Sequence, residues 1–222
     1  LTQFLGCPDR GDHTELPSLE KDEDEVEGAL GQISLEGQHM LVGIHPGAKA
    51  ATRSWSPERF GRVARRLHKE YGALITVTGT DRERTIVEAV TEACGPGAVN
   101  LAGRLSVGGL AALIRRQALL ITNDTGPAHL AYATQTRSVT IFGSAEPERW
   151  RGVDTTRNTA LSVSVPCRPC EYSECPIGYL CLNMVTVDAV ARAARFLLDD
   201  WVRSRLPAIW PNTDLSTDAI AG

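Results

Sequence analysis

The sequence lacks any apolar run long enough to cross a membrane, and no basic segment followed by an apolar one opens the chain. We therefore expect no membrane span and no secretory signal, and we expect a cytoplasmic protein. An excess of basic residues is also missing, because the formal net charge is −4 at pH 7. This balance gives no electrostatic reason to expect a nucleic-acid partner.

Two common phosphate-binding loops are absent as well. No Gly-x-Gly-x-x-Gly motif follows the first predicted strand, and no glycine-rich loop ends in Lys-Ser or Lys-Thr. These absences exclude the standard dinucleotide fingerprint and the Walker loop. Any phosphate site in this chain must therefore be built from other residues.

What is present is the composition of an ordinary globular protein, 42% apolar and 23% charged over 222 residues. Strands are predicted at 40–44, 74–78, 98–101, 119–121, 138–142 and 160–163. Helices are predicted at 57–71, 81–94, 106–117, 127–134 and 185–202. The alternation predicts an α/β fold with a Rossmann-like, doubly wound parallel sheet, whose ligands bind at the carboxyl ends of the strands.

The first 38 residues differ from the remainder in being polar and acidic. A helix is predicted over 22–33, with Val26, Ala29, Leu30 and Ile33 on one face. We interpret its charge run as a solvated face or a linker.

Residues 119–131 predict a buried strand that leads directly into a helix. Asp124 or Thr125 is placed to cap this helix, and a proline occupies its first turn. The free N–H groups near Thr125 and Gly126 favour an anion, and Gly126 admits close approach of a ligand. His129 follows one turn later and can face the same point. The alternative is an ordinary strand-to-helix turn with a good cap.

Glycine and hydroxyl side chains also follow other predicted strands, with Gly47 after the first and Thr80 after the second. The turn at Gly47 leads to Lys49 and Arg53. Either cation can meet a diphosphate held on the helix after Thr125, and Arg53 can do so bidentately. The alternative is that both are solvated loop charges.

Four cysteines lie close together in the proline-rich loop 166–183: Cys167, Cys170, Cys175 and Cys181. Clustered reduced thiols in a cytosolic protein indicate structural zinc. Their spacing is not that of a standard zinc ribbon, so a disulfide, an iron–sulfur site and plain thiols stay open as alternatives.

Trp150 lies in the loop after the fifth predicted strand, beside Glu148 and Arg149. An indole ring at this place can stack on a base or a sugar, or it can anchor the core. The sequence leaves both interpretations open.

Five short motifs occur in a fixed order along the chain. They are HPGA (45–48), RSWSPE (53–58), NLAG (100–103), NDTGPAHLA (123–131) and FG (142–143). This ordered set, over about residues 40–200, resembles glycosyltransferase family 9, the heptosyltransferases that build the lipopolysaccharide core. The resemblance implies the two-lobed GT-B architecture, in which the C-terminal lobe binds the sugar donor.

On this resemblance, residues 39–203 correspond to the nucleotide-sugar-binding, Rossmann-like lobe, including the cysteine-rich loop 166–183. Residues 1–38 correspond to the connection between the lobes and the end of an N-terminal lobe. Residues 204–222 correspond to a tail.

The resemblance also implies roles at the motif after the central strand. Asp124 would hold sugar hydroxyls, while Thr125 and Gly126 would take the diphosphate. Arg53 would pair with a donor phosphate, at a position where the family usually has Lys. Because a guanidinium differs from an ammonium in geometry, the details of this contact are expected to differ.

An acidic residue after the second strand contacts the ribose in some family members, and Glu83 or Asp81 would be its counterpart. His129 would orient the donor. The full expected donor-binding set is Gly47, Lys49, Arg53, Thr80, Glu83, Asp124, Thr125, Gly126 and His129.

The implied activity is inverting, metal-independent transfer from a nucleotide-diphosphate sugar, ADP-heptose in particular, to a saccharide acceptor such as the lipopolysaccharide core. The general base is expected in the N-terminal lobe, which would be a partner of this one. The transfer needs no cofactor, and the enzyme would touch the inner membrane only peripherally. Two alternatives stay open: a non-catalytic nucleotide-sugar-binding module, and an interaction domain stabilised by a metal in the cysteine loop.

Overall fold

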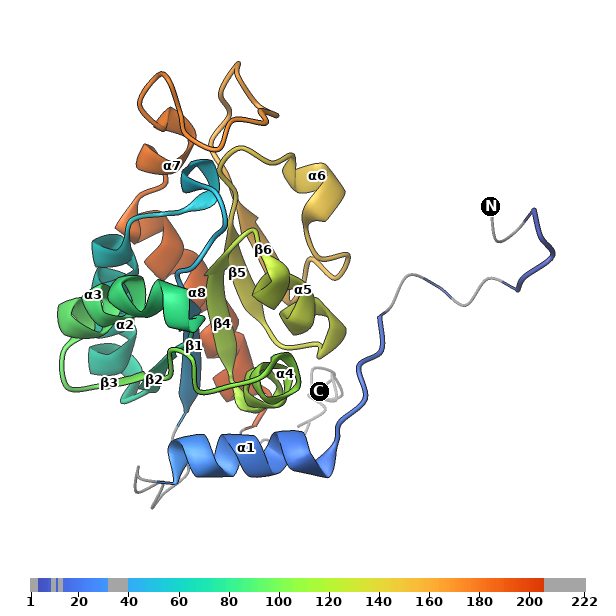
Figure 1. Ribbon diagram of the computed structural model, residues 1–222, viewed down its shortest axis with the longest axis vertical. Coiled ribbons are helices and arrows are strands. Elements are labelled where there is room, and N and C mark those ends of the chain that lie inside the picture. Colours follow the sequence, from blue (N-terminus) through green and yellow to red (C-terminus); the bar gives the residue numbers. More distant parts are fainter. Residues whose placement is uncertain (1–3, 9–10, 12–13, 32–39, 206–222) are drawn as a thin grey trace, which may run out of the picture.

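The computed structural model describes residues 4–8, 11, 14–31 and 40–205, and its centre is one six-stranded sheet (Figure 1). All neighbouring strands are parallel, in the order β3-β2-β1-β4-β5-β6. The strands are β1 Leu41–His45, β2 Leu74–Val77, β3 Ala98–Asn100, β4 Leu119–Asn123, β5 Ser138–Ile141 and β6 Asn158–Leu161. The predicted doubly wound α/β fold is confirmed, and this strand order is that of the Rossmann fold.

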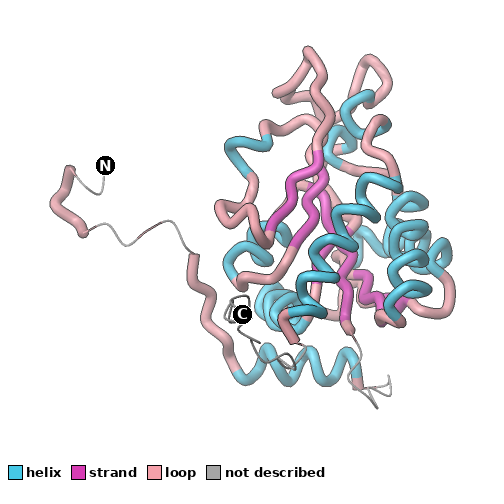
Figure 2. The backbone as a smooth tube through the Cα atoms, turned by 180° about the vertical axis from the view of Figure 1, so that it is seen from behind, coloured by secondary structure: helices cyan, strands magenta, loops and turns pink. Residues whose placement is uncertain are grey.

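The strand order reverses direction between β1 and β4, which lie side by side in the middle of the sheet. Their register pairs Ile44 with Ile121 and His45 with Thr122, so both strands end at the same level. In such sheets the chains leaving the two strands diverge to opposite faces and open a crevice. Figure 2 shows the long loops gathered beyond this end of the strands.

Helices cover both faces of the sheet, because successive strand residues point to opposite sides. On one face, Ile121 belongs to the large core with α2 (Pro57–Tyr71), α3 (Arg84–Cys94) and α8 (Val187–Arg203). On the other face, Leu120 packs with α4 (Val107–Arg116) and α5 (Gly126–Ala133). Two short helices, α6 (Pro147–Trp150) and α7 (Leu180–Asn183), belong to the loops.

Most predicted elements are confirmed to within a few residues. Helix α2 has the predicted bounds, and the Ser56 hydroxyl caps it by accepting a hydrogen bond from Arg59 N at 3.3 Å. The least accurate strand is β6, predicted at 160–163. It begins earlier because Asn158, a polar residue, bonds to Ser138 of β5 at 2.8 Å and starts the pairing.

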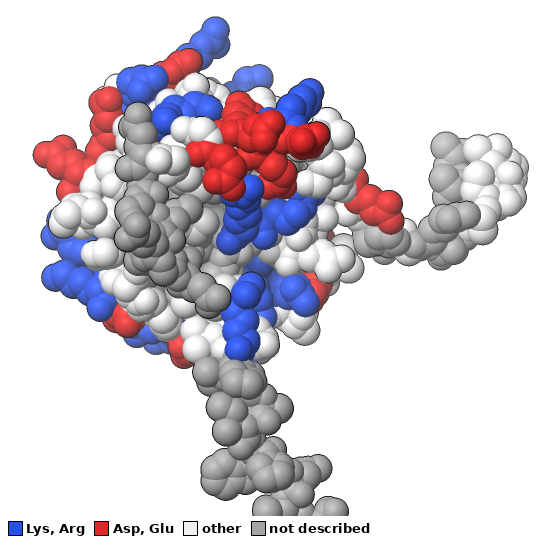
Figure 3. Space-filling model, turned by 90° about the horizontal axis from the view of Figure 1, so that it is seen from below, with Lys and Arg blue, Asp and Glu red and all other residues white. Residues whose placement is uncertain are grey.

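Helix α1 (Glu20–Leu30) corrects part of the expectation of a solvated charge run, because some of its acidic side chains are exposed and others contact α4. Val26, Ala29 and Leu30 share one face as predicted, and that face is buried against α4, which was not predicted; Ile33 lies outside the described residues. Its acidic residues also dock there, and Figure 3 shows them beside basic side chains on this face.

Three carboxylates of α1 explain that docking, two paired with an arginine and one bonded to the backbone at the start of α4. Arg116, at the end of α4, bonds to Glu23 at 2.7 Å and to Glu27 at 2.6 Å. Glu25 accepts a hydrogen bond from the backbone of Ser106, which caps the start of α4, at 2.7 Å. The charges of α1 therefore match both ends of α4, a pairing that its own sequence does not reveal.

No helix within the described part of the chain is both long enough and apolar enough to span a membrane.

Candidate functional site

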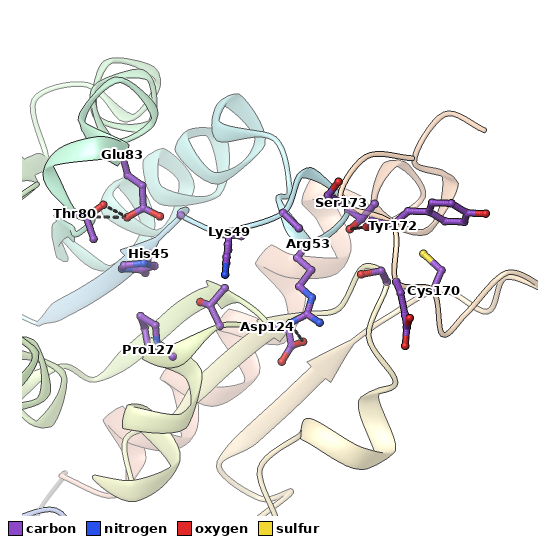
Figure 4. A pocket seen from close by; sticks show the side chains of 18 of the residues that line it. His45, Lys49, Arg53, Thr80, Glu83, Asp124, Pro127, Cys170, Tyr172 and Ser173 are labelled. Atoms are coloured by element: carbon purple, nitrogen blue, oxygen red, sulfur yellow. Dashed lines mark hydrogen bonds and ion pairs between the residues drawn. The ribbon is translucent and has the colours of Figure 1, made fainter. Parts of the chain in front are cut away.

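A cavity of about 630 Å³ opens at the carboxyl ends of β1, β2 and β4, where the strand order reverses. It lies between the loop after β1 and the start of α5 (Figure 4). Eight of the nine residues expected to bind the donor line it: Gly47, Lys49, Arg53, Thr80, Glu83, Asp124, Thr125 and Gly126. The ninth, His129, does not line this cavity.

The start of α5 faces this cavity without a side-chain cap. Thr125 takes the N-cap position, but its hydroxyl bonds to Asn123 O at 3.4 Å instead of to the helix. The predicted capping by Asp124 or Thr125 is therefore wrong. A Cβ on Gly126 would meet open space, so the backbone there is accessible from the cavity. Uncapped N–H groups at the positive end of a helix dipole form an anion site.

Asp124 is a buried carboxylate, only 4% exposed, at the edge of this anion site. Burial raises its pKa, and the charges of Arg53 and His129 oppose that rise. The Arg53 guanidinium lies 3.9 Å from Asp124 Oδ2 while remaining half exposed. Arg53 thus faces Asp124 on one side and open cavity on the other, as Figure 4 shows.

Asn123 fixes the loop that carries these cations to the end of β4. Its amide accepts a hydrogen bond from Trp55 N at 3.0 Å and donates one to Pro46 O at 2.7 Å. Trp55 is itself buried, and its indole N–H donates to Val185 O at 3.0 Å. Trp55 and Asn123, from two of the motifs, therefore position the loop that carries Arg53.

Thr80 and Glu83 form a capping box after β2. Glu83 Oε2 accepts hydrogen bonds from Thr80 N at 2.8 Å and from the Thr80 hydroxyl at 2.9 Å. The other oxygen, Oε1, lies against Gly47, and a Cβ at that glycine would collide with it. The glycine thus lets a carboxylate approach the turn after β1, next to the cavity.

His45 also lines the cavity and was not among the expected donor-binding residues. It ends β1, is buried, and its Nδ1 lies 3.0 Å from the Thr78 hydroxyl. Burial lowers its pKa to about 4, with Glu83 opposing the shift. His45 is therefore neutral at pH 7. The sequence signal was its position at a strand end, but burial is a property of the fold.

The cysteine-rich loop supplies a second unexpected wall, with Cys170, Glu171, Tyr172 and Ser173 lining the cavity. The Thr52 hydroxyl donates to Tyr172 O at 2.6 Å, and Thr52 N donates to Ser173 O at 3.2 Å. Figure 4 shows the Tyr172 ring turned away from Asp124. This contact spans 120 residues of sequence, so no local pattern could have predicted it.

The turn after β5 completes this wall. Ser144 N donates to Thr52 O at 3.1 Å, and Cys170 N donates to Ser144 O at 3.0 Å. A Cβ on Gly143 would collide with Thr52 O, so only glycine permits this approach. The loop after β1, the turn after β5 and the cysteine-rich loop therefore form one hydrogen-bonded unit.

The cysteines themselves are all free thiols, and Cys181 is buried. Cys175 Sγ accepts a backbone hydrogen bond from Tyr179 N at 3.1 Å, and such bonds lower the pKa of its thiol. Among the described residues, no group of three or more His, Cys, Asp or Glu side chains has an arrangement that could hold a metal ion. The arrangement shown thus does not fit zinc, and the zinc site stays a prediction.

The comparisons with known proteins agree with this fold. The family model described as glycosyltransferase family 9 (heptosyltransferase) matches residues 3–180. The lipopolysaccharide heptosyltransferase 3 of Escherichia coli is 31% identical over 117 residues, which cover 52% of this chain and 34% of that protein.

Two solved structures share the fold. A glycosyltransferase family 9 protein from Veillonella parvula superposes with a TM-score of 0.75 at 22% identity, covering 89% of this chain and 57% of that one. The E. coli heptosyltransferase WaaC with ADP gives a TM-score of 0.60 at 16% identity, covering 88% and 53%. The chain thus spans about half the length of these solved proteins.

The family match covers most of the chain, and the sheet matches part of the GT-B heptosyltransferase structures. The chain therefore belongs to glycosyltransferase family 9, the heptosyltransferases.

Proposed function

We propose that this chain supplies the donor site of a heptosyltransferase that uses a nucleotide-diphosphate sugar, with ADP-heptose as the donor. The observation that carries the proposal is the convergence of Asp124, the uncapped start of α5 and two cations on one cavity. A family relative has been solved with ADP, which supports the choice of an adenine nucleotide.

The diphosphate would lie on the N-terminus of α5. Backbone N–H groups at Thr125 and Gly126 would donate to its oxygens, and Lys49 and Arg53 would approach from the loop after β1. A buried carboxylate beside a diphosphate repels it unless a cation intervenes. Arg53, 3.9 Å from Asp124, is placed to balance both groups.

Asp124 would accept hydrogen bonds from sugar hydroxyls, and Glu83 Oε1 would accept one from the ribose. Each is held by its surroundings: Asp124 by burial at the strand end, Glu83 by its capping box with Thr80. Glu83, Lys49 and Asp124 lie one after another along the cavity (Figure 4). They would contact the ribose, the diphosphate and the sugar, in that order.

The chemical step would break the bond between the anomeric carbon and the diphosphate oxygen. Negative charge grows on that oxygen, and the helix N-terminus with Arg53 and Lys49 stabilises it without a metal ion. An acceptor hydroxyl attacks from the opposite face and inverts the anomeric centre. A carboxylate of the N-terminal lobe would take its proton, and the acceptor would be a saccharide such as the lipopolysaccharide core.

Calorimetric titration of ADP and ADP-heptose, with UDP and GDP as controls, tests the proposal. We expect both adenine compounds to bind, and Asp124→Asn to weaken ADP-heptose about tenfold while changing ADP binding little, because only the sugar uses that carboxylate. Asp188→Asn removes an exposed carboxylate on α8 that pairs with Arg66, and serves as the matched control.

Equal weakening of ADP and ADP-heptose by Asp124→Asn would contradict the sugar contact. Failure of every nucleotide at millimolar concentration would contradict the donor site. Binding of ADP-heptose without transfer to any acceptor, once an N-terminal lobe is supplied, would identify the chain as a binding module instead.

A further inference from the structure

The structure places two histidines in different cavities. His129 lines a cavity of about 690 Å³ beside α6, together with Trp150, which is exposed, so the interpretation of that tryptophan as a core anchor is wrong. His45, at the end of β1, lines the cavity at the strand ends and is only 7% exposed. None of the proposed donor contacts uses His45.

His45 lies at the end of the cavity where the nucleoside would bind under the proposed function. Figure 4 shows it on the same side as Thr80 and Glu83, with Lys49 between this group and Arg53. Glu83 is the residue proposed to contact the ribose, and the two cations are proposed to contact the diphosphate. A ligand contact at His45 would therefore be made to the nucleoside.

Hydrogen bonds from two neighbouring strands hold the His45 ring in place. Its Nδ1 lies 3.0 Å from the hydroxyl of Thr78, the residue that follows β2. The backbone of Thr78 is fixed in turn, because its N–H donates to Ile44 O at 2.9 Å. The next residue along the chain, Pro46, accepts a hydrogen bond from Asn123 at the end of β4, at 2.7 Å. The imidazole is thus oriented before any ligand binds.

The second ring nitrogen of His45, Nε2, opens into the cavity. It has no hydrogen-bond partner among the described residues, since the contact with Thr78 uses Nδ1. In the described part of the chain, Gln117 Oε1 is the one fully buried side-chain nitrogen or oxygen without a partner. Nε2 is therefore not fully buried, and the cavity is the space that it reaches.

A carboxylate oxygen is left open at the same end of the cavity. Glu83 uses Oε2 for both hydrogen bonds to Thr80, so Oε1 has no hydrogen-bond partner within the residues that the structure describes. Oε1 lies against Gly47, two residues after His45. The charge of Glu83 also opposes the fall in the pKa of His45. An imidazole nitrogen and a carboxylate oxygen, both unpaired, thus flank the turn after β1.

The chemistry of these two groups points to a pair of hydroxyls. Burial lowers the pKa of His45 to about 4, so the ring is neutral at pH 7 and offers no charge to a phosphate. Nε2 accepts a hydrogen bond in one tautomer and donates one in the other, and a hydroxyl can pair with either. The Glu83 carboxylate accepts from a hydroxyl as well. The ribose of a nucleotide carries two adjacent hydroxyls, on C2′ and C3′.

We propose that His45 is a specificity-determining residue of the donor site, whose Nε2 binds one ribose hydroxyl while Glu83 Oε1 binds the other. His45 thereby selects ribonucleotides over deoxyribonucleotides. The inference rests on the proposed function, because it needs a nucleotide in this cavity. His45 takes no part in the chemical step, since it contacts the nucleoside and not the reacting atoms.

The test is calorimetric titration of ADP, 2′-deoxy-ADP and 3′-deoxy-ADP into the full 222-residue chain. We expect each deoxy compound to bind about tenfold more weakly than ADP, because each leaves one enclosed polar group without its partner. This comparison needs no substitution in the protein, so it does not depend on the folding of a variant.

His45→Asn separates the two ribose contacts. The asparagine amide reaches the place of Nδ1 and can keep the bond to Thr78, whereas no atom takes the place of Nε2. We expect about tenfold weaker binding of ADP, lost sensitivity to one of the two hydroxyls, and unchanged sensitivity to the other. His68→Asn is the matched control, because His68 Nδ1 is also held, 2.9 Å from Ala73 O, and lies outside the cavity.

Long-range ¹H–¹⁵N spectra of the wild-type chain follow the ring nitrogens of both histidines directly. We expect ADP to shift Nε2 of His45 and to leave the ring of His68 unchanged. One of the two deoxy compounds, the one that lacks the hydroxyl bound by His45, should leave Nε2 close to its position in the free chain.

The outcomes separate this inference from the proposed function. If ADP binds and His45→Asn keeps the wild-type penalty for both deoxy compounds, the inference is overturned and the donor site stands. An Nε2 resonance that ADP does not shift has the same meaning. Equal binding of all three nucleotides to the wild type overturns the inference together with the ribose contact of Glu83. Failure of ADP to bind overturns the proposed function, and this inference with it.

Discussion

At the scale of single residues, the paired side chains of Arg53 and Asp124 have opposite charges and different exposure to the cavity. The carboxylate is buried and its pKa is raised, whereas the guanidinium is half exposed and faces the cavity. Arg53 therefore stabilises the charge of Asp124, and under the proposed function it would contact the diphosphate as well. A residue pair of this kind links the cost of a buried charge to ligand binding.

Replacing Arg53 should weaken nucleotide binding in graded steps. Arg53→Ala is expected to weaken ADP about tenfold or more, because a charge-assisted contact is worth about 1.5–3 kcal/mol. Arg53→Lys should lie between, because it keeps the charge and loses the bidentate geometry. Calorimetry measures both, with Arg66→Ala on the surface of α2 as control. Unchanged ADP affinity in Arg53→Ala would rule out this phosphate contact.

His45 should make stability depend on pH. Its folded pKa is about 4 against 6.5 for the ordinary group, so below pH 6.5 the unfolded chain takes up a proton that the folded chain does not. The free energy of unfolding should therefore fall as the pH drops from 6.5 towards 4, by on the order of 3 kcal/mol from this group. Urea unfolding between pH 4 and 7 measures it.

The control for that experiment is His45→Asn, which removes the titrating ring and leaves the other groups in place. We expect this variant to be less stable at pH 7 and to have a flatter pH dependence between 6.5 and 4. If wild type and variant lose stability in parallel as the pH falls, the buried neutral imidazole is not responsible.

At the scale of elements, the start of α5 lacks a stabilising side-chain cap, and its backbone N–H groups are therefore left open to an anion. Thr125→Asp would supply the missing cap and raise the free energy of unfolding by about 1 kcal/mol. The same carboxylate would occupy the place proposed for the diphosphate, so ADP should bind at least about tenfold more weakly. Thr125→Ser is the control. A variant that gains stability and binds ADP normally would place the diphosphate elsewhere.

The metal content of the cysteine-rich loop can be measured directly. The sequence predicts zinc, but the described thiols are not arranged to hold a metal ion. Elemental analysis of purified wild-type protein and of Cys170→Ser tests the prediction. A zinc site requires about stoichiometric zinc in the wild type, with the thiols rearranged around it, and less zinc in the variant. Metal-free protein that stays folded and binds ADP would remove zinc from the account.

Strands and helices were predictable where local pattern and tertiary environment agree. The apolar run of β4 and the Ser56 cap with its Pro57 specify their elements directly. The docking of α1 was not predictable in this way. Its carboxylates are matched by Arg116 and Ser106, about 80 to 90 residues away, and sequence periodicity carries no information about such partners.

The candidate site was predictable for a different reason. Parallel strands bring their carboxyl ends to one edge, so residues that follow different strands, such as Gly47, Thr80 and Asp124, had to meet there. His129 does not line this cavity, because a residue one turn into α5 can face either flank of that helix. The wall formed by Tyr172 depends on a loop without regular structure, which no periodicity describes.

At the scale of the whole molecule, one helix separates two cavities of similar size. The N-terminus of α5 faces the cavity at the strand ends, and its side, with His129 and Tyr132, faces the cavity beside α6. The predicted cytoplasmic location and the contact with an N-terminal lobe stay predictions, since the chain spans about half of the solved relatives.

The central claim is that the N-terminus of α5 binds the diphosphate of the donor. The most direct test is ADP titration into the ¹⁵N-labelled chain, followed by amide chemical shifts. The account predicts the largest shifts at Thr125 and Gly126, with further shifts in the Lys49–Arg53 loop. Saturable shifts that leave these amides unchanged, and occur only around Trp150 or in the cysteine-rich loop, would contradict it.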